Sequence, residues 1–219
     1  MCRGDVDLWA AFCGSSCWVL NMNKHSFGIT VFSVVIALGS LALTNEAYSE
    51  PAMAKMCQGC HGKEGVSAQE TVPTIAGISA FVHADYLYAY RDGARTCSDP
   101  KTKAMCTMTA KLTDEQIEEL AEYFAGMQYQ AAEQAFDADK AAQGAAIHDD
   151  KCSKCHTDGG SNPEDDASII AGQWLPYLKQ SLSQFASENR EQPKAMLSKT
   201  TALSEADIEA LAHYYASQQ

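Results

Sequence analysis

Two pentapeptides, Cys57-Gln58-Gly59-Cys60-His61 and Cys152-Ser153-Lys154-Cys155-His156, decide how this sequence is interpreted. On one helical turn the two cysteines and the histidine of each would share a face, because residues three and four apart are neighbours there. Cys-x-x-Cys-His is the attachment signature of c-type haem. The sequence therefore predicts two covalently bound haems c, held by Cys57, Cys60 and His61 and by Cys152, Cys155 and His156, with each histidine as an iron ligand.

Two other kinds of site use paired cysteines. A four-cysteine zinc site usually brings its pairs within about 15–20 residues of each other, whereas Cys57 and Cys152 are 95 positions apart. A thioredoxin-like redox site requires a pattern of alternating strands and helices, which this sequence lacks. Haem attachment is the interpretation that fits the spacing.

The offset of 95 extends beyond the motifs. Ile75-Ala76-Gly77 matches Ile170-Ala171-Gly172 at this offset, whereas Tyr86-Leu87 matches Tyr177-Leu178 at an offset of 91 that then persists to the end. One internal duplication explains both values if four extra residues lie between Gly77 and Tyr86. The sequence thus predicts two similar domains, 50–130 and 142–219, joined by an Ala-rich polar linker at 131–141.

Both copies end in the same helical pattern. Thr113-Asp-Glu-Gln116 is a capping box, and Ser204-Glu-Ala-Asp207 is its weaker counterpart. Apolar residues follow each box at helical spacing, and no alternating strand pattern of useful length occurs. The predicted fold class is all-α, with each domain wrapped around its haem.

Met105 and Met196 are the predicted sixth ligands of the two irons. They occupy the same position in the two copies, 44 and 40 residues after the respective histidine, which is far enough to reach the other haem face. A Met/His pair raises the reduction potential of the haem. Met108 competes with Met105, whereas the second copy contains no other methionine.

The N-terminus indicates export. Residues 27–43 are apolar, Lys24 precedes them and small residues follow, so 22–49 is predicted to be a signal peptide cleaved before Glu50. An uncleaved anchor is the alternative, although seventeen residues are short for a span of about 20. Residues 1–21 fit neither interpretation and are expected to be an over-extended reading frame. The expected location is the periplasm, with no stable membrane span after cleavage.

Cys97 and Cys106 are the only cysteines of the expected mature chain outside the haem motifs. An oxidising compartment permits a disulfide between them. Because the segment that they enclose ends next to Met105, the disulfide would also hold the methionine loop.

The remaining histidines, His83, His148 and His213, lie among polar residues and are expected at the surface. A backbone carbonyl near Val72-Pro73 is expected to accept a hydrogen bond from the His61 ring and orient it. The second copy has Ser168 at the position of Pro73, and its carbonyl is expected to act in the same way.

Over residues 50–219 the chain resembles the di-haem class I cytochromes c of the c-four type. The resemblance rests on the duplicated haem motif, the Ala-Gly turn and the late methionine before a helix. The second half is most similar to the cytochrome subunit of flavocytochrome c sulfide dehydrogenase, on YQAAEQAF (129–136), IAGQWLPYL (170–178) and YASQQ (215–219). Two departures stand out: the segment before Cys57 is short, which implies a stunted first helix, and that subunit is not expected to carry the Cys97/Cys106 pair.

The resemblance implies a periplasmic electron-transfer subunit, not itself an enzyme, that accepts electrons from an FAD-containing sulfide dehydrogenase subunit. FAD is expected only in that partner. The alternative is a free c-four-type carrier that delivers electrons to a terminal oxidase. Residues 78–85, with Ile78, Phe81 and Val82, are expected to form either core or a contact with the partner.

The formal net charge of −12 argues against a nucleic-acid ligand, because such proteins usually present a basic face. An acidic surface instead favours a basic redox acceptor, which it would attract through electrostatic steering.

Overall fold

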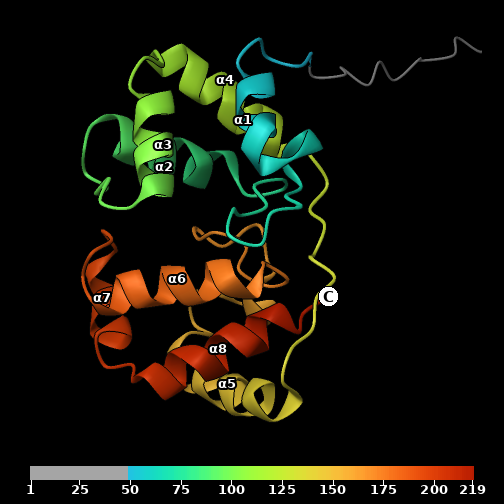
Figure 1. Ribbon diagram of the computed structural model, residues 1–219, viewed down its shortest axis with the longest axis vertical. Helices are drawn as coiled ribbons and strands as arrows, with labels where there is room; N and C mark the ends of the chain where they lie inside the picture. The colour runs from blue at the N-terminus through green and yellow to red at the C-terminus, as the bar shows by residue number, and fades with distance from the viewer. Residues whose placement is uncertain (1–48) are drawn as a thin grey trace, which may run out of the picture. The chain divides into compact units, whose positions relative to one another are not determined.

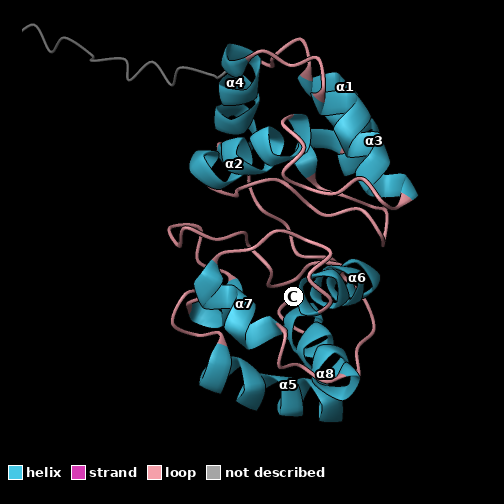
Figure 2. Cartoon of the chain, turned by 90° about the vertical axis from the view of Figure 1, so that its left-hand side faces the viewer, coloured by secondary structure: helices cyan, strands magenta, loops and turns pink. Residues whose placement is uncertain are grey.

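The computed structural model describes residues 49–219, so the predicted N-terminal extension 1–21 and all but the last residue of the predicted signal peptide 22–49 lie outside the described residues. Within residues 49–219 every regular element is helical (Figures 1 and 2), which confirms the all-α class. In chain order the elements are α1 Ala54–His61, η1 Lys63–Gly65, α2 Ala80–Arg91, α3 Pro100–Thr109, α4 Asp114–Ala125, α5 Ala138–Lys151, η2 Asp158–Gly160, α6 Leu175–Ala186, α7 Lys194–Thr200 and α8 Glu205–Ala216. The same order of one leading helix, a short 3-10 turn and three further helices occurs twice.

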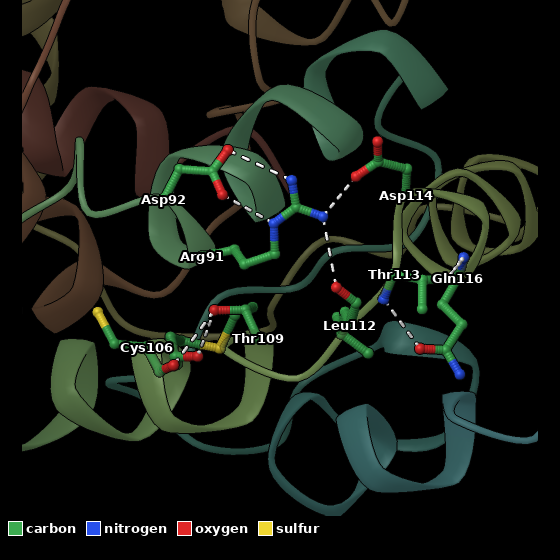
Figure 3. Close-up of polar contacts among 9 residues, drawn as sticks. Arg91, Asp92, Cys106, Thr109, Leu112, Thr113, Asp114 and Gln116 are labelled. Carbon is green, nitrogen blue, oxygen red and sulfur yellow. Dashed lines mark hydrogen bonds and ion pairs between the residues drawn. The ribbon is translucent and has the colours of Figure 1, made fainter.

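The last helix of each copy begins at its predicted capping box. In α4 the Gln116 N–H donates to Thr113 Oγ1 at 3.3 Å, and the Thr113 N–H donates back to Gln116 Oε1 at 3.0 Å (Figure 3). Ser204 and Asp207 form the equivalent pair at α8. Each box satisfies N–H groups that have no partner inside the helix. These two helices supply much of the buried core, namely Ile117, Leu120, Ala121, Tyr123 and Phe124 from α4 and Ile208, Leu211, Ala212 and Tyr215 from α8.

The leading helices of the two copies differ, as the short segment before Cys57 predicted. Helix α1 has eight residues and α5 has fourteen. The longer helix approaches α8 very closely at Gly144, where an added Cβ atom would collide with the Ala210 carbonyl oxygen. Gly144 therefore sets the contact distance between the first and last helices of the second copy.

The four extra residues of the first copy do not lie between Gly77 and Tyr86, and that prediction was wrong. Helices α2 and α6 have twelve residues each, and both their first and last residues are 95 positions apart. The left-handed residues that follow these helices, Gly93 (φ 80°) and Glu188 (φ 58°), keep the same offset. The match between Tyr86-Leu87 and Tyr177-Leu178 pointed to the wrong place for the insertion, because residues four positions apart lie on the same face of a helix.

The insertion lies after α2, and most of it lengthens α3, which has ten residues where α7 has seven. Helices α3 and α7 end at Thr109 and Thr200, 91 positions apart, and both threonines are buried. Arg95 and Arg190 still match at 95, so the extra residues fall between Arg95 and Thr109. The insertion thus falls within the part of the chain that contains Cys97 and Cys106.

The two copies share an apolar cluster and a polar contact. Ile78 and Val82 are both 4% exposed and pack with Ile169 of the second copy. Of the three apolar residues expected in a core or partner contact, only Phe81 is exposed, at 68%. Ile78 and Val82 are therefore core residues.

The polar contact joins Thr74 to Gln173. The Thr74 N–H donates to Gln173 Oε1 at 3.0 Å, and Gln173 Nε2 donates to the Thr74 carbonyl at 2.7 Å. Beside them Trp174 Nε1 donates to the Ser67 carbonyl at 2.8 Å. A buried amide with both ends bonded to backbone fixes the register between the copies.

The connection between the copies is extended up to Asp137, whose carboxylate caps α5 by accepting the N–H groups of Asp139 and Lys140. The predicted linker 131–141 therefore includes the first turn of α5. Among residues 49–219, no helix combines the length and apolar character that crossing a bilayer requires.

Replacing Gly144 with Ala is expected to lower the free energy of unfolding by about 1–3 kcal/mol or more, because backbone must shift to admit the methyl group. The matched control is Gly126→Ala, since Gly126 has φ −74° and its nearest neighbouring atom would lie 3.5 Å from the added Cβ. Denaturant unfolding followed by circular dichroism measures both. Equal stabilities of the two variants would contradict the close approach.

Candidate haem sites

The first haem motif lies on α1, which carries Cys57, Cys60 and His61 in its last two turns. The helix stops at once after the histidine, because Gly62 adopts φ 79° and a Cβ atom there would collide with the Val66 carbonyl oxygen. Both thiols are free of disulfides. The segment therefore presents two thiols and an imidazole from one short helix.

The His61 ring is oriented by the backbone, as predicted. Its Nδ1–H donates to the Pro73 carbonyl at 2.9 Å, because a carbonyl can only accept. Burial lowers the pKa of His61, and the Pro73 hydrogen bond offsets part of this shift. The ring is thus held neutral, with Nε2 as the nitrogen whose lone pair is available to a metal.

A cavity of about 460 Å³ opens against this helix. Cys57, Cys60 and His61 line it, and so does Met105 from α3. Its volume falls in the range of about 300–1,000 Å³ that is usual for cofactor sites. Two thiols, a neutral imidazole and a thioether in one largely apolar cavity are the donor set that a haem c requires, so the residues present fit this cofactor.

Met105 and Met108 both line the cavity. The hydrogen bond of the threonine that ends each methionine helix distinguishes the two candidates. Thr109 Oγ1 donates to the Met105 carbonyl at 3.0 Å (Figure 3 draws the bonds of Thr109), and Thr200 Oγ1 donates to the Met196 carbonyl at 3.3 Å. Met105 and Met196 are both half-buried, whereas Met108 is 37% exposed. The equivalent backbone settings support Met105 as the counterpart of Met196.

The second haem motif begins where α5 ends. Cys152 is the C-cap of that helix, and the His156 N–H donates to the Cys152 carbonyl at 3.0 Å, so the motif forms one further turn. Cys152 and Cys155 are free of disulfides. Burial lowers the pKa of His156, which keeps this imidazole neutral as well.

The expected backbone partner of the second histidine is not present. Within residues 49–219, the buried His156 Nδ1 has no hydrogen-bond partner, so the carbonyl of Ser168 does not act as that of Pro73 does. Asp165 orders this loop instead: its carboxylate accepts the Thr157 N–H at 2.7 Å, the Thr157 hydroxyl at 2.8 Å and the Asn162 amide at 3.2 Å. The two haem loops are therefore held by different interactions.

Both loops nevertheless close in the same way. The Gly65 carbonyl accepts the N–H groups of Ile75 and Ala76, and the Gly160 carbonyl accepts those of Ile170 and Ala171. The next residue of each copy then bonds to the last helix: Gly77 N–H to Phe124 at 2.9 Å, and Gly172 N–H to Tyr215 at 2.8 Å. Each histidine loop is thus anchored to the core of its own domain.

The three histidines expected at the surface are buried, and that prediction was wrong. His83, His148 and His213 are 7%, 2% and 8% exposed. Each ring has a partner: the Ile75 carbonyl at 2.7 Å, the Tyr215 hydroxyl at 3.0 Å and the Asp137 N–H at 3.0 Å, respectively. Burial lowers the pKa of His83 to about 4. These rings are internal bonding groups of the core.

A disulfide restrains α3, and Arg91 bridges the end of α2 and the segment that leads into α4. The structure pairs Cys97 with Cys106, with their Cα atoms 6.3 Å apart, which fastens the segment before α3 to the helix that carries Met105. Beyond the other end, Arg91 binds Asp92, Asp114 and the Leu112 carbonyl (Figure 3).

Sequence reasoning missed two buried arginines, Arg95 and Arg190, which also line the cavity. The sequence does contain an indication that the two arginines are equivalent. They are 95 positions apart, and each follows an aromatic residue, Tyr90 or Phe185, by five positions. The early switch to the offset of 91 concealed this match.

Comparisons with known proteins match both halves of the chain. Residues 50–128 match the family model "Cytochrome c", and residues 139–214 match "Cytochrome C oxidase, cbb3-type, subunit III". Cytochrome c4 of Pseudomonas aeruginosa is 26% identical over 197 residues, which cover 83% of this chain and 94% of that protein.

Solved structures agree in fold. Reduced recombinant cytochrome c4 from Pseudomonas stutzeri has a TM-score of 0.65 and 24% identity, and the match covers 78% of this chain and all of that one. The thiosulfate dehydrogenase TsdBA from Marichromatium purpuratum has a TM-score of 0.63 and 24% identity, and covers 74% of this chain and 36% of that one.

Removing the disulfide with Cys97→Ser and Cys106→Ser together is expected to cost about 2–3 kcal/mol of unfolding free energy, because the reduced chain gains loop entropy. Denaturant unfolding of the variant and of the wild-type chain measures this. Mass spectrometry of unreduced wild-type protein should also show two hydrogens fewer than the dithiol form. Two alkylatable thiols in the native protein would refute the pairing.

Proposed function

We propose that the chain, which is similar to the di-haem cytochromes c4, carries electrons in the periplasm between a donor and an acceptor, through one haem in each domain. The observation that carries this proposal is the cavity that brings Cys57, Cys60, His61 and Met105 together. Cytochromes c4 are electron-transfer proteins, and this chain is a di-haem electron-transfer protein of that type.

Each residue set has a defined task. Cys57 and Cys60, like Cys152 and Cys155, attach the porphyrin through thioethers, while His61 and His156 bind iron from neutral rings. When bound, haem c supplies an iron that cycles between ferric and ferrous states. Met105 and Met196 would bind the iron through their thioethers, which would favour the ferrous state and leave no open site for a substrate. Electron transfer, not substrate oxidation at iron, follows from this ligand set.

The three segments that suggested a flavoprotein partner make hydrogen bonds within the chain. Gln134 Nε2 donates to the Gln173 carbonyl, the Leu175 N–H donates to Gln134 Oε1, and Gln219 Nε2 donates to the Gln134 carbonyl. Tyr129 also donates to the Ala171 carbonyl. These contacts give the segments a role inside the chain, and of their large apolar side chains Phe136 is exposed, at 43%.

A free carrier fits these contacts as well as a subunit of a flavoprotein complex does. The FAD-containing sulfide dehydrogenase subunit is the second candidate, and the exposed side chains of Phe81 and Phe136 are features of the described surface that an apolar partner contact would use. The acidic charge suits a basic acceptor in either case. Export through residues 22–49 provides the compartment in which haem c and the disulfide are compatible.

Two haems per chain are expected in a pyridine haemochrome assay of the protein purified with its haem maturation system. Met105→Ala and Met196→Ala should each leave both haems attached and lower the potential of one, because the thioether no longer stabilises the ferrous iron. The matched control is Met108→Ala, since Met108 also lines the first cavity. Redox titration measures all three variants.

A Met108→Ala variant that loses the absorption band of a methionine–iron bond, with Met105→Ala unchanged, would overturn the ligand assignment. One haem per chain would overturn the di-haem proposal itself. Purification from the native source with FAD and haem assays on the same peak separates the two partner candidates. Haem without flavin, together with slow reduction by sulfide, supports the free carrier; flavin in the same peak with rapid reduction supports the complex.

A further inference from the structure

The Cys97–Cys106 disulfide stands where the second copy has a hydrogen-bonded clamp. In the second copy Gln192 Nε2 donates to the Phe185 carbonyl of α6 at 2.8 Å, and Gln192 Oε1 accepts the Thr200 hydroxyl of α7 at 2.7 Å. One glutamine thus ties the methionine helix to the helix before it. Cys97 and Gln192 each lie six residues beyond the end of that preceding helix, α2 or α6. The first copy has therefore exchanged two hydrogen bonds for one S–S bond.

Helix α3 has few other restraints around Met105. In the described part of the chain, Thr109 has no side-chain partner that corresponds to Gln192, because its hydroxyl donates to the Met105 carbonyl of its own helix at 3.0 Å. Among the described side chains of α3, Thr109 is also the only fully buried one. Segments with few buried contacts open at low free energy. The position of α3 therefore depends strongly on the disulfide.

The other end of the disulfide is held by the second copy. On the N-terminal side of Cys97, Thr96 Oγ1 donates to the Asn189 carbonyl at 2.7 Å. On its C-terminal side, Gln184 Nε2 donates to the Asp99 carboxylate at 3.2 Å. Opening of the S–S bond would thus leave Cys97 in place and would release α3.

The two sulfurs differ in access. Cys97 is exposed, whereas Cys106 is half-buried, so a nucleophile from solution reaches Cys97 first. Exposed disulfides are the ones that exchange readily with thiols. Cys106 would be the leaving sulfur, and Lys103 lies one turn before it on α3, where a positive charge stabilises a thiolate. The haem cysteines would form thioethers, which contain no S–S bond for a thiolate to attack.

We propose that Cys97–Cys106 is an exchange site for small thiolates, and that its opening loosens Met105 from the iron of the first haem. One thiolate attacks Cys97 Sγ, the S–S bond breaks, and Cys106 leaves as a thiolate. A second thiolate attacks the mixed disulfide and releases Cys97 together with an external disulfide. Two external thiolates thereby lose the two electrons that the protein disulfide gains, and water supplies the protons. This inference rests on the proposed function, because it requires Met105 on the iron.

The expected consequence is a change in the potential of one haem. A methionine thioether favours ferrous over ferric iron, so a loosened helix would lose the ferric bond first. Opening of the disulfide therefore lowers the potential of the first haem. The second haem is insensitive to thiols, because the Gln192 clamp contains no S–S bond. Thiols thus set the potential difference between the two haems.

The test uses the full-length haem-loaded protein. It is treated with dithiothreitol, separated from it, blocked with iodoacetamide and reoxidised at iron with ferricyanide. Mass spectrometry should show two carbamidomethyl groups, and the methionine–iron absorption band should lose the contribution of one haem. At a fixed ambient potential the ferric-to-ferrous ratio of the first haem should rise about tenfold, which corresponds to about 59 mV for a one-electron couple. The second haem, identified through the Met196→Ala variant, should keep its potential.

Three controls make the result specific. The double variant Cys97→Ser with Cys106→Ser should begin at the lowered potential and should not respond to dithiothreitol. Gln192→Ala breaks the clamp of the second copy, so it should lower the potential of the second haem with or without thiol treatment. Reduced wild-type protein that is not blocked should regain its original band and potential after oxidation with diamide. Should the double variant not fold, the treated wild-type protein decides the question.

Three outcomes would overturn the inference. A wild-type chain with no haem on Cys57 and Cys60 would remove the proposed function as well. A haem-loaded chain whose cysteines Cys97 and Cys106 become alkylatable only after denaturation would remove the exchange site alone. Two alkylated cysteines in the folded protein, with the absorption band and both potentials unmoved, would show that the disulfide does not act on Met105.

Discussion

The closure of each histidine loop onto the last helix of its own domain is the interaction on which the rest of the structure depends. One carbonyl, Gly65 or Gly160, gathers two N–H groups from the far side of the loop, and the residue after them bonds to α4 or α8. A loop of this length contains many backbone groups that must find partners once it leaves water. Closing it with these three backbone hydrogen bonds lets an otherwise irregular segment lie beside a cofactor. The helices then need only to cover the cavity, which explains why the core of an 80-residue unit is sufficient.

On this shared scaffold the two copies have diverged in how they support the histidine and the methionine. The first copy uses the Pro73 carbonyl for its imidazole and a disulfide for its methionine helix, with a shortened α1. The second copy has a long α5, a carboxylate that orders its histidine loop, and no counterpart of the disulfide, since Leu197 matches Cys106. In the first copy, the disulfide and the Pro73 hydrogen bond thus hold the methionine helix and the histidine ring, whereas the second copy has the packing of its longer first helix. Two haems bound with the same proposed ligand types would lie in unequal surroundings, which is a physical basis for unequal electron affinity.

The features that the sequence predicted correctly are local. Thr113 and Ser204 bond within one turn, and the haem motifs span five residues, so spacing alone identifies them. The misplaced features are those whose partners are distant in the chain. His213 looks like a polar surface residue until the N–H of Asp137 reaches it from 76 positions away, and Arg190 is buried by Tyr86 of the other copy. Helical periodicity also tolerates a shift of four residues, which is why the insertion was assigned to the wrong side of α2. Periodicity along a sequence does not report contacts between residues that are distant in the chain.

The contact between the copies has a symmetry of its own. At the offset of 95, Ile78 corresponds to Gln173 and Thr74 to Ile169, so the apolar pair Ile78–Ile169 and the polar pair Thr74–Gln173 are the same contact seen from its two ends. Such a contact is what a symmetric homodimer would use. If two first domains met through this surface, Ile78 of one would face Thr74 of the other, and the Thr74 N–H and carbonyl would lack the Gln173 amide as their partner. If two second domains met, Gln173 would be buried against Ile169. Each mismatch leaves polar groups unpaired at about 1–3 kcal/mol apiece. The two halves of the chain therefore pack as an asymmetric pair. The contact surface of each half is complementary to that of the other half and would not be complementary to the same half of a neighbouring chain.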